Sequence, residues 1–201
     1  MAVSQPLEGV LEEIKVTARI PKLLLHCCCA PCASHVLEYL SPFFSITALF
    51  FNPNIRPREE YDKRAAELRK LLSLVKYVNA VDAIVCEYDP AGFEAAAAPF
   101  WDEPEGGKRC LKCFELRLGE TAMRASSLGY EYCATTLSVG PHKDAELLNK
   151  TGADMAERYG GIYLISDFKK RDGYKRSVEL SKQYGLYRQN YCGCMRAQRA
   201  D

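Results

Sequence analysis

Seven of the ten cysteines in this 201-residue chain fall into three short groups. They are Cys28-Cys29-x-x-Cys32, Cys110-x-x-Cys113 and Cys192-Gly193-Cys194. Thiolates bind soft metal ions and take part in thiol–disulfide exchange, so clustered cysteines in a reducing compartment indicate a metal centre or a redox catalyst. A secreted disulfide scaffold would need an export signal, and the charged first 22 residues contain no apolar core for one.

The first two groups together suit a metal centre. Cys28 and Cys29 follow a short apolar run, and Cys110 and Cys113 lie three apart, on one face, at the start of an expected helix. Four thiolates are enough for a tetrahedral zinc ion or an iron–sulfur cluster. Zinc ribbons keep their ligands within a short segment, whereas Cys29 and Cys110 are far apart in sequence. This separation favours a cluster buried in a cleft, with zinc as the alternative.

The third group is better suited to redox chemistry. A disulfide between Cys192 and Cys194 would close a very small ring, and its strain would make it easy to reduce. Gly193 permits the backbone geometry that such a ring requires. We therefore interpret this group as a redox-active dithiol rather than a structural disulfide.

The other thiols and one histidine have weaker signals. Cys86 and Cys133 lie in expected apolar strands, where small core residues are the ordinary interpretation. Cys27 precedes the first group, and strand alternation would point it away from Cys28. His26 could bind a metal or donate a proton, and a core histidine at a strand end is an equally good interpretation.

The composition indicates a globular chain without a membrane span. Hydrophobic residues make up 48% and charged residues 26% of the sequence. The longest apolar runs, at residues 46–51 and 23–25, are strand-length and too short to cross a bilayer. We expect a cytoplasmic protein. The sequence has no Walker A motif and no Gly-x-Gly-x-x-Gly, so we expect no nucleotide cofactor.

Basic residues concentrate in the C-terminal segment 168–201. The whole chain has a formal net charge of +1, but this segment alone carries +6 and residues 1–167 carry −5. A local contact with a polyanion would explain this asymmetry, and a solvated helical face is the alternative. The segment has three acids, Asp172, Glu179 and Asp201, and nine basic residues, Lys169, Lys170, Arg171, Lys175, Arg176, Lys182, Arg188, Arg196 and Arg199.

Strand-like and helix-like segments alternate along the chain. Expected strands are residues 22–26, 45–51, 83–88, 132–139 and 162–166, and expected helices are 31–40, 57–75, 92–100, 110–128, 144–159 and 174–184. This alternation predicts an α/β fold with a mostly parallel, Rossmann-like sheet and helices on both faces. The active site, lined by cysteines, should lie at the carboxyl edge of the strands. We expect residues 1–21 to be an extension outside the sheet and residues 22–201 to form a single catalytic domain.

Three motifs in this order resemble the QueH family of epoxyqueuosine reductases. They are LLLHCCCAPC at 23–32, RCLKCFELRL at 109–118 and YRQNYCGC at 187–194. The resemblance runs from Lys22 to Cys194. It implies reduction of the epoxide on a hypermodified guanosine at the anticodon wobble position of tRNA, the final step in making queuosine. It also implies independence from cobalamin and a need for an external electron donor.

The resemblance implies a role for each cysteine group. Cys28, Cys29, Cys110 and Cys113 would hold a [4Fe–4S] cluster. Cys192 and Cys194 would be the redox-active pair. Cys32 is at a family position, and the implied role is a ligand to an additional mononuclear iron. Neither Cys27 nor residues 1–21 are explained by the family pattern.

Epoxide removal requires two electrons and two protons. The candidate acids are Asp167, Asp172, Tyr191 and His26, and the sequence does not rank them. Basic residues between Lys169 and Arg199 would contact phosphates, and Tyr187 and Tyr191, beside Arg188, would stack on an unstacked base. Two other functions remain open, a heterodisulfide-reductase-like iron–sulfur electron carrier and a zinc-bound RNA-binding module.

Overall fold

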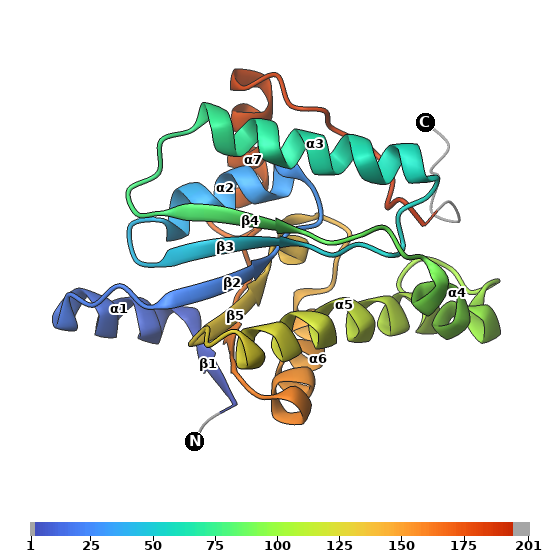
Figure 1. Ribbon diagram of the computed structural model, residues 1–201, viewed down its shortest axis with the longest axis horizontal. Helices are drawn as coiled ribbons and strands as arrows, with labels where there is room; N and C mark the ends of the chain where they lie inside the picture. The colour runs from blue at the N-terminus through green and yellow to red at the C-terminus, as the bar shows by residue number, and fades with distance from the viewer. Residues whose placement is uncertain (1–2, 195–201) are drawn as a thin grey trace.

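The computed structural model describes residues 3–194, which form a six-stranded sheet in which all neighbouring strands are parallel (Figure 1). The strand order is β1-β6-β5-β2-β3-β4. The strands are β1 (Ser4–Pro6), β2 (Lys22–His26), β3 (Ser45–Phe50), β4 (Val81–Val85), β5 (Tyr132–Thr135) and β6 (Ile162–Ile165). The strand that leads into the first cysteine group, β2, therefore lies inside the sheet, between β5 and β3.

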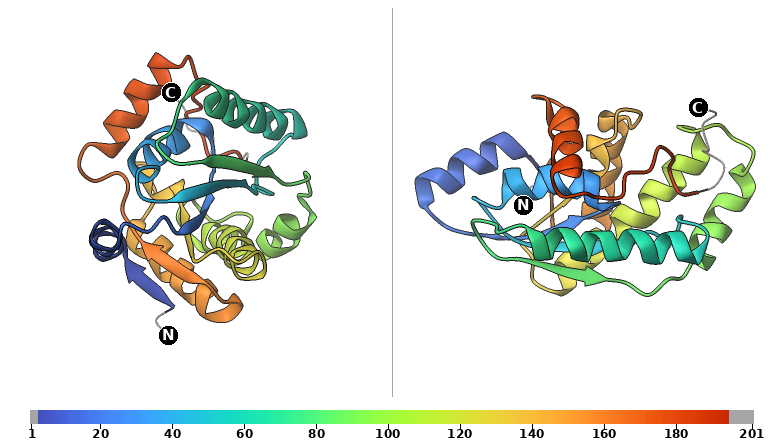
Figure 2. Two further views of the ribbon diagram at one scale, coloured as in Figure 1. Left: turned by 60° about the vertical axis from the view of Figure 1, so that its left-hand side comes forward. Right: turned by 90° about the horizontal axis from the view of Figure 1, so that it is seen from above.

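Helices cover both faces of the sheet (Figure 2). One face carries α1 (Leu7–Thr17), α2 (Ala30–Leu40) and α3 (Arg58–Leu74), and α7 (Gly173–Gln183) packs against α2. The other face carries α5 (Lys108–Ser127) and α6 (Ala145–Tyr159), and α4 (Ala91–Ala97), which continues into the 3₁₀ turn η1 (Ala98–Phe100), packs against α5. The predicted α/β class with helices on both faces is confirmed.

The apolar side chains of β2 divide between the two faces because successive residues of a strand point in opposite directions. Leu23 and Leu25 belong to the core beneath α1, α2 and α3, while Leu24 belongs to the core beneath α5 and α6. All three side chains are fully buried. Burial on both faces explains why this strand is continuously apolar rather than alternating.

Of the N-terminal segment, residues 3–21 are described, and they are not an extension outside the sheet, so that expectation was wrong. Ser4–Pro6 pairs in parallel with β6 and forms one edge of the sheet. The helix that follows, α1, buries Leu7, Val10, Leu11 and Ile14 in the core. A three-residue edge strand has too few alternating positions to be recognised from sequence.

Two other expected elements differ from the structure. The strand expected at residues 83–88 is β4, Val81–Val85, so Cys86 follows the strand and is only partly buried. The strand expected at 132–139 ends at Thr135, whose side chain accepts a hydrogen bond from the amide of Leu137 and starts the 3₁₀ turn η2 (Thr136–Val139). This turn moves the following loop to the carboxyl edge of the sheet.

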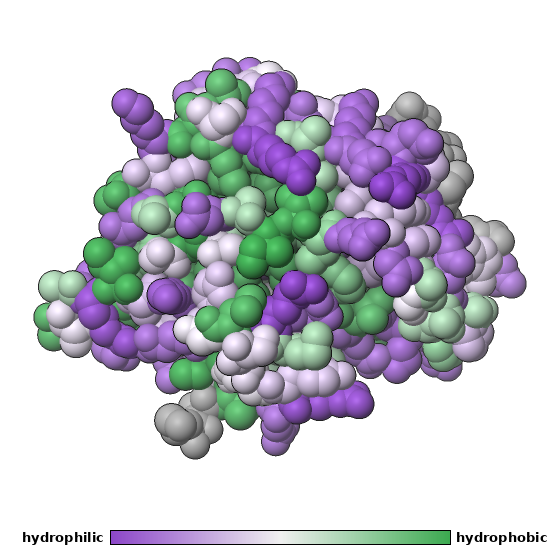
Figure 3. Space-filling model, viewed as in Figure 1, coloured by the Kyte–Doolittle hydropathy of each residue, from purple (hydrophilic) through white to green (hydrophobic). Residues whose placement is uncertain are grey.

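The outer strand β4 is partly exposed. In the space-filling view, apolar side chains gather across the middle of the face where β4 lies, between the more hydrophilic surfaces of α3 and α5 (Figure 3). Across residues 3–194 we found no helix with the length and apolarity needed to span a bilayer.

Candidate active site

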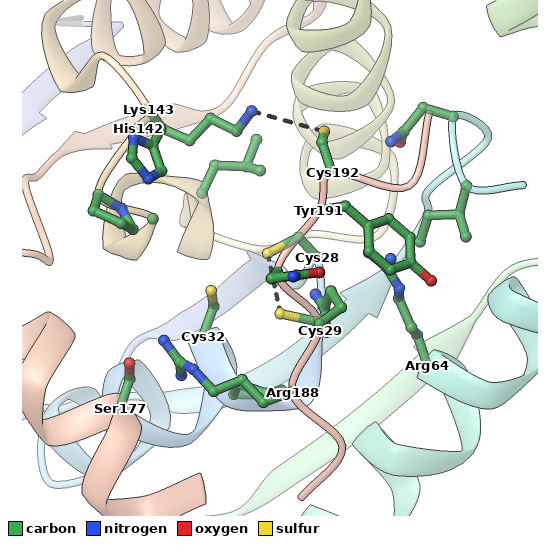
Figure 4. Close-up of a pocket in the computed structure, with 18 of the residues that line it drawn as sticks. Cys28, Cys29, Cys32, Arg64, His142, Lys143, Ser177, Arg188, Tyr191 and Cys192 are labelled. Carbon is green, nitrogen blue, oxygen red and sulfur yellow. Dashed lines mark hydrogen bonds between the residues drawn. The ribbon is translucent and has the colours of Figure 1, made fainter. Parts of the chain in front are cut away.

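A cavity of about 560 Å³ opens at the carboxyl edge of the sheet. Its walls come from the β2–α2 loop and the start of α2, the loops after β3 and η2, the loop before α5, helices α3, α5 and α7, and the segment after α7 (Figure 4). The cavity is lined by cysteines and by polar and charged side chains, which include Cys28, Cys29, Cys32, Asn54, Arg64, Glu105, Arg117, Lys143, Tyr174, Arg188, Gln189, Tyr191 and Cys192. The active site was predicted at this edge, and the cavity lies there.

The first cysteine group forms a compact sulfur triad. The Sγ atoms of Cys28, Cys29 and Cys32 all lie within 4.8 Å of one another, and those of Cys28 and Cys29 are 3.7 Å apart. Cys29 is the N-cap of α2 in an extended conformation, and its side chain makes no capping hydrogen bond. Hydrogen bonds, first from Cys28 and then from Cys32, hold the pKa of Cys29 well below its usual range. Three convergent thiols of this kind can ligate a soft metal ion.

The second group lies in the first turns of α5. Cys110 and Cys113 are both buried. The amide of Gly106 donates to Cys110 Sγ at 3.2 Å, and Arg117 Nη1 donates to Cys113 Sγ at 3.8 Å. Burial raises the pKa of Cys113 to about 11. Neither residue lines the cavity, although Cys28 packs against the apolar cluster that contains Cys110.

The predicted ligand set therefore divides between the triad and α5. Among residues 3–194, the group close enough for one mononuclear ion is the triad, which includes Cys32 and excludes Cys110 and Cys113. The ligands of a four-iron cluster are spaced more widely than those of a single ion, so this proximity does not test the set Cys28, Cys29, Cys110 and Cys113. That set stays a prediction.

The third group places one thiol in the cavity and one behind it. Cys192 lines the cavity, and Lys143 Nζ lies 3.7 Å from its Sγ (Figure 4). The ammonium of Lys143 also pairs with Glu105 at 2.8 Å. Cys194 is buried beside Phe93. A hydrogen bond from Cys194, and then the charge of Lys143, lowers the pKa of Cys192 to about 5. Both sulfurs are free thiols in this structure.

A buried network connects α5 with β2 and the loop after β3. Arg117 donates to Asn52 Oδ1 at 2.6 Å and to His26 Nε2 at 3.3 Å, and His26 Nδ1 is 2.9 Å from the hydroxyl of Thr135. His26 has no exposed surface, and burial, followed by the charge of Arg117, lowers its pKa to about 3. The ring is therefore neutral near pH 7.

The wall beside Cys192 combines a buried arginine with a tyrosine. Arg64 pairs with Glu60 at 2.6 Å and lies 5.2 Å from the centre of the Tyr191 ring. Gly193 adopts a positive φ of 74°, and a Cβ there would lie 3.3 Å from Arg64 Nη1. The carbonyl of Gly193 accepts a hydrogen bond from the amide of Arg56 at 2.9 Å. Glycine thus allows the chain to pass close to Arg64.

A model of the family described as epoxyqueuosine reductase QueH matches residues 23–200, nearly the whole chain. The chain belongs to the QueH family of epoxyqueuosine reductases. It is 44% identical to epoxyqueuosine reductase QueH of Streptococcus pyogenes, over 88% of this chain and 70% of the relative. It is 34% identical to the enzyme of the same name from Thermotoga maritima, over 86% of this chain and 88% of the relative. The oxidoreductase class expected from the sequence is confirmed.

A solved structure shares the fold. It is described as the predicted subunit of a tRNA methyltransferase from Methanocaldococcus jannaschii, and it aligns with a TM-score of 0.51 over 81% of this chain and 75% of the other. The two sequences are only 15% identical, so this similarity supports the α/β architecture alone.

The four candidate proton donors differ in whether they line the cavity. Tyr191 lines the cavity, whereas His26, Asp167 and Asp172 do not. Asp167 lies 3.8 Å from Lys169, and Asp172 lines a second surface groove between α2 and α7. Of the two tyrosines expected to stack on a base, Tyr187 lies outside the cavity wall. Tyr191 is therefore the best placed of the candidates.

The basic segment is distributed over several surfaces. Arg188 lines the cavity, with its guanidinium 5.1 Å from the centre of the Tyr174 ring. Lys169 donates to the carbonyl of Lys143 at 2.6 Å, and Arg176 pairs with Glu38 at 2.7 Å. Lys170, Arg171 and Lys175 are exposed. Arg196, Arg199 and Asp201 lie outside the described residues.

Sequence reasoning missed two cations of the site. Arg117 follows Cys113 by four residues, one helical turn, and that spacing could have identified it. Lys143 follows η2 in a turn in which its amide donates to the carbonyl of Gly140 at 3.1 Å. No local sequence signal marks it, because its partner Cys192 lies 49 residues further along the chain.

Proposed function

We propose that this protein is an epoxyqueuosine reductase, which reduces the epoxide of epoxyqueuosine at the tRNA wobble position to an alkene and so completes queuosine. The observation that carries the proposal is one cavity lined by the sulfur triad and by Cys192, in a chain of the QueH family. Because tRNA is the substrate, we place the protein in the cytoplasm.

We propose that Cys28, Cys29, Cys110 and Cys113 hold a [4Fe–4S] cluster, with Cys32 as a ligand to an additional iron. The donors are all sulfur, which suits iron–sulfur chemistry. A buried cation, Arg117, contacts one of these sulfurs, so the surroundings favour a negatively charged group. When bound, the cluster would pass electrons one at a time between an external donor and the site.

Cys192 and Cys194 would supply the electron pair. Oxidation of the two thiols to one disulfide releases two electrons and two protons. These convert the epoxide to an alkene and one water, so atoms and electrons balance, and the external donor then reduces the disulfide. Cys192 faces the cavity beside Lys143 and is the thiol placed to react first, while the buried Cys194 would close the disulfide.

The cavity wall offers contacts for a nucleoside. Tyr191 presents a ring for stacking and a hydroxyl that can donate a proton. Asn54 Oδ1, Arg64 Nη2 and Gln189 Oε1 are buried, lack a hydrogen-bond partner and belong to residues that line the cavity. Buried polar atoms require partners, so these three support binding of a ligand with both donors and acceptors. Arg188 at the rim would contact phosphate.

Nucleoside analysis of tRNA tests the proposal. A strain that lacks this gene, and has no other enzyme for the step, should accumulate epoxyqueuosine and contain no queuosine. Expression of the chain should restore queuosine, and expression of the Cys192→Ser variant should not. Unchanged queuosine in the deletion strain, or restoration by the variant, would contradict the proposed role.

Metal analysis tests the cofactor separately. The sulfur triad also suits zinc, so a zinc-bound RNA-binding module is the competing function. Protein purified without air should be brown and contain iron and sulfide if the proposal holds. Colourless protein with zinc, still able to bind tRNA, would favour the competing function.

A further inference from the structure

Arg117 is a buried cation in the wall of the cavity. Its side chain is on α5, one turn after Cys113, and only 2% of the residue is exposed. Each of its nitrogen atoms has one partner. Nη2 donates to Asn52 Oδ1 at 2.6 Å, Nε to His26 Nε2 at 3.3 Å, and Nη1 to Cys113 Sγ at 3.8 Å.

These partners do not compensate the charge of Arg117. Asn52 is an uncharged amide, and the buried His26 cannot act as a counter-ion because an imidazole carries no negative charge. The two other buried cations of the cavity differ, since Arg64 pairs with Glu60 at 2.6 Å and Lys143 with Glu105 at 2.8 Å. Among the ion pairs of residues 3–194, none includes Arg117. A buried charge without a counter-charge costs several kcal/mol, and no carboxylate pairs with Arg117 among these residues, so the site favours an anion at this point.

The groups that face the guanidinium and can carry negative charge are sulfurs. Cys113 is in contact with it, and Cys28 and Cys192 line the same cavity as Arg117. A cluster held by four thiolates has a net negative charge, and its sulfurs accept hydrogen bonds. Such a group would provide what the neutral partners of Arg117 do not.

We propose that Arg117 is the charge-compensating residue of the iron–sulfur cluster, and that its guanidinium raises the reduction potential of the cluster. The inference rests on the proposed function because it needs the cluster. Net charge and hydrogen bonds to the sulfurs set the potential of such clusters. Arg117 acts through both, because it places a positive charge in a buried site and donates to Cys113. Each reduction adds an electron, which a nearby cation stabilises.

Redox titration of the full-length protein, reconstituted without air and without tRNA, tests this role. In Arg117→Met the cluster potential should become more negative by at least about 59 mV, a tenfold change in the one-electron equilibrium. Arg117→Lys keeps the charge and should retain most of the wild-type potential. Arg124→Met is the matched control, because Arg124 is on the same helix but is part-exposed and paired with Glu120 at 2.6 Å. Its potential should not change.

The gain in melting temperature on loading the cluster gives a second readout. Loading should stabilise the wild type more than Arg117→Met, because only the wild type gains a counter-charge. If Arg117→Met folds but takes up no iron while Arg117→Lys does, the charge is needed for binding and the proposal is supported. If Arg117→Met does not fold, Arg117→Gln replaces it. The cluster potential of Arg117→Gln must then be more negative than those of the wild type and of Arg117→Lys.

Two results would overturn the inference. One is a wild-type potential in the neutral variant, and the other is an equal shift in the neutral and lysine variants, which would assign the effect to geometry rather than charge. A wild-type protein that takes up no iron would be a different failure, because it would remove the cofactor of the proposed function.

Discussion

The cysteine groups at two sides of the cavity are held in different ways. The loop with Cys28 leaves a central strand, and its backbone is fixed by β3 on one side and by the η2 turn after β5 on the other. The amide of Cys27 donates to the carbonyl of Leu49 at 2.8 Å, and the amide of Cys28 donates to the Thr136 hydroxyl at 3.3 Å. Asn52 Nδ2 also donates to the carbonyl of Cys27 at 3.0 Å. A loop with its backbone held by these hydrogen bonds suits metal ligands, because the distances between their sulfur atoms must stay constant.

The segment with Cys192 and Cys194 has neither helix nor strand. Its side chains contact several neighbours, but its backbone has few hydrogen bonds: the carbonyl of Gly193 accepts from the amide of Arg56 at 2.9 Å, and the amide of Tyr187 donates to Glu67 at 2.7 Å. Segments with few backbone hydrogen bonds open at low free-energy cost. The comparison teaches that the fixed group suits metal binding, while the loosely held group can follow the shape change between dithiol and disulfide.

The largest expected effect separates the proposed cluster ligands from the other thiols. Anaerobic reconstitution of the wild type should give about four iron and four sulfide per chain. Cys110→Ala or Cys113→Ala should abolish the visible absorption, because a cluster needs all four thiolates. Cys133→Ala is the control, because this thiol is buried in β5 away from the cavity and its loss should leave absorption intact. Full absorption in both ligand variants would place the ligands elsewhere.

The next effect tests whether the loosely held group is redox-active. Substitution of both Cys192 and Cys194 by Ser should lower turnover by roughly 10³-fold or more, the scale expected when an essential reacting group is removed. Iron content should stay the same, because the fixed group is untouched. Loss of iron from the double variant would show that Cys192 and Cys194 bind the metal. The two cysteine groups would then not differ in function as proposed.

A smaller effect should come from the backbone of the loosely held group. Gly193→Ala places a Cβ 3.1 Å from Ile55 Cγ1 at a positive φ, a conformation that costs about 1–2 kcal/mol for other residues. A cost of this size lowers the ratio of the native to the displaced conformation of the segment by roughly tenfold. Single-turnover rates should fall by up to that factor while iron content is unchanged. Gly92→Ala, which meets no atom within 4 Å, should behave as wild type.

The contribution of the basic segment to tRNA binding should appear in the salt dependence. Substitution of the exposed Lys170, Arg171 and Lys175 by Gln should reduce the slope of log K against log salt by roughly one for each residue that contacts a phosphate. Lys169 is left in place because it holds the carbonyl of Lys143. The same change at Lys15 and Lys150, outside the segment, should not alter the slope. If the slope is the same in the segment variant as in the control variant, the basic segment makes no phosphate contact and is a solvated face.

The smallest effect concerns how α7, and with it the loosely held segment, is fixed to α2. A hydrogen bond from Arg176 lowers the pKa of Glu38 in the folded state. This bond therefore contributes stability above the ordinary pKa of the carboxyl and loses it as the pH falls through the folded pKa. Because both side chains are about 42% exposed, Glu38→Gln should cost only about 0.5 kcal/mol. Urea unfolding should show that difference at about pH 7, and the difference should become smaller at about pH 3.

Much of the layout followed from local sequence signals. The apolar run at β2 and Pro31 in the first turn of α2 predicted that Cys28 and Cys29 lie at the carboxyl edge of the sheet. Asp144 caps α6, where its side chain accepts from two backbone amides, and the expected helix indeed starts there. These features depend on residues that are neighbours in the chain, which is why the sequence predicts them.

The parts that could not be predicted depend on distant partners. The pairing of Lys143 with Cys192 and of Arg117 with Asn52 joins segments that are 49 and 65 residues apart. The β1 strand is defined only by its pairing with β6. The sequence also did not show that Cys110 would lie outside the cavity wall, because that depends on how α5 packs against the sheet.

The central place of β2 governs when the thiols become protected during synthesis. His26 at its end bonds to Thr135, which lies 109 residues further along the chain. Contacts this far apart in sequence form late, because a long loop must close before they contribute. A nascent chain that has not yet reached β5 therefore carries Cys28 and Cys29 on an incomplete sheet edge, open to oxidants and to foreign metal ions. Loading of the proposed metal centre should therefore depend on timing as well as on affinity.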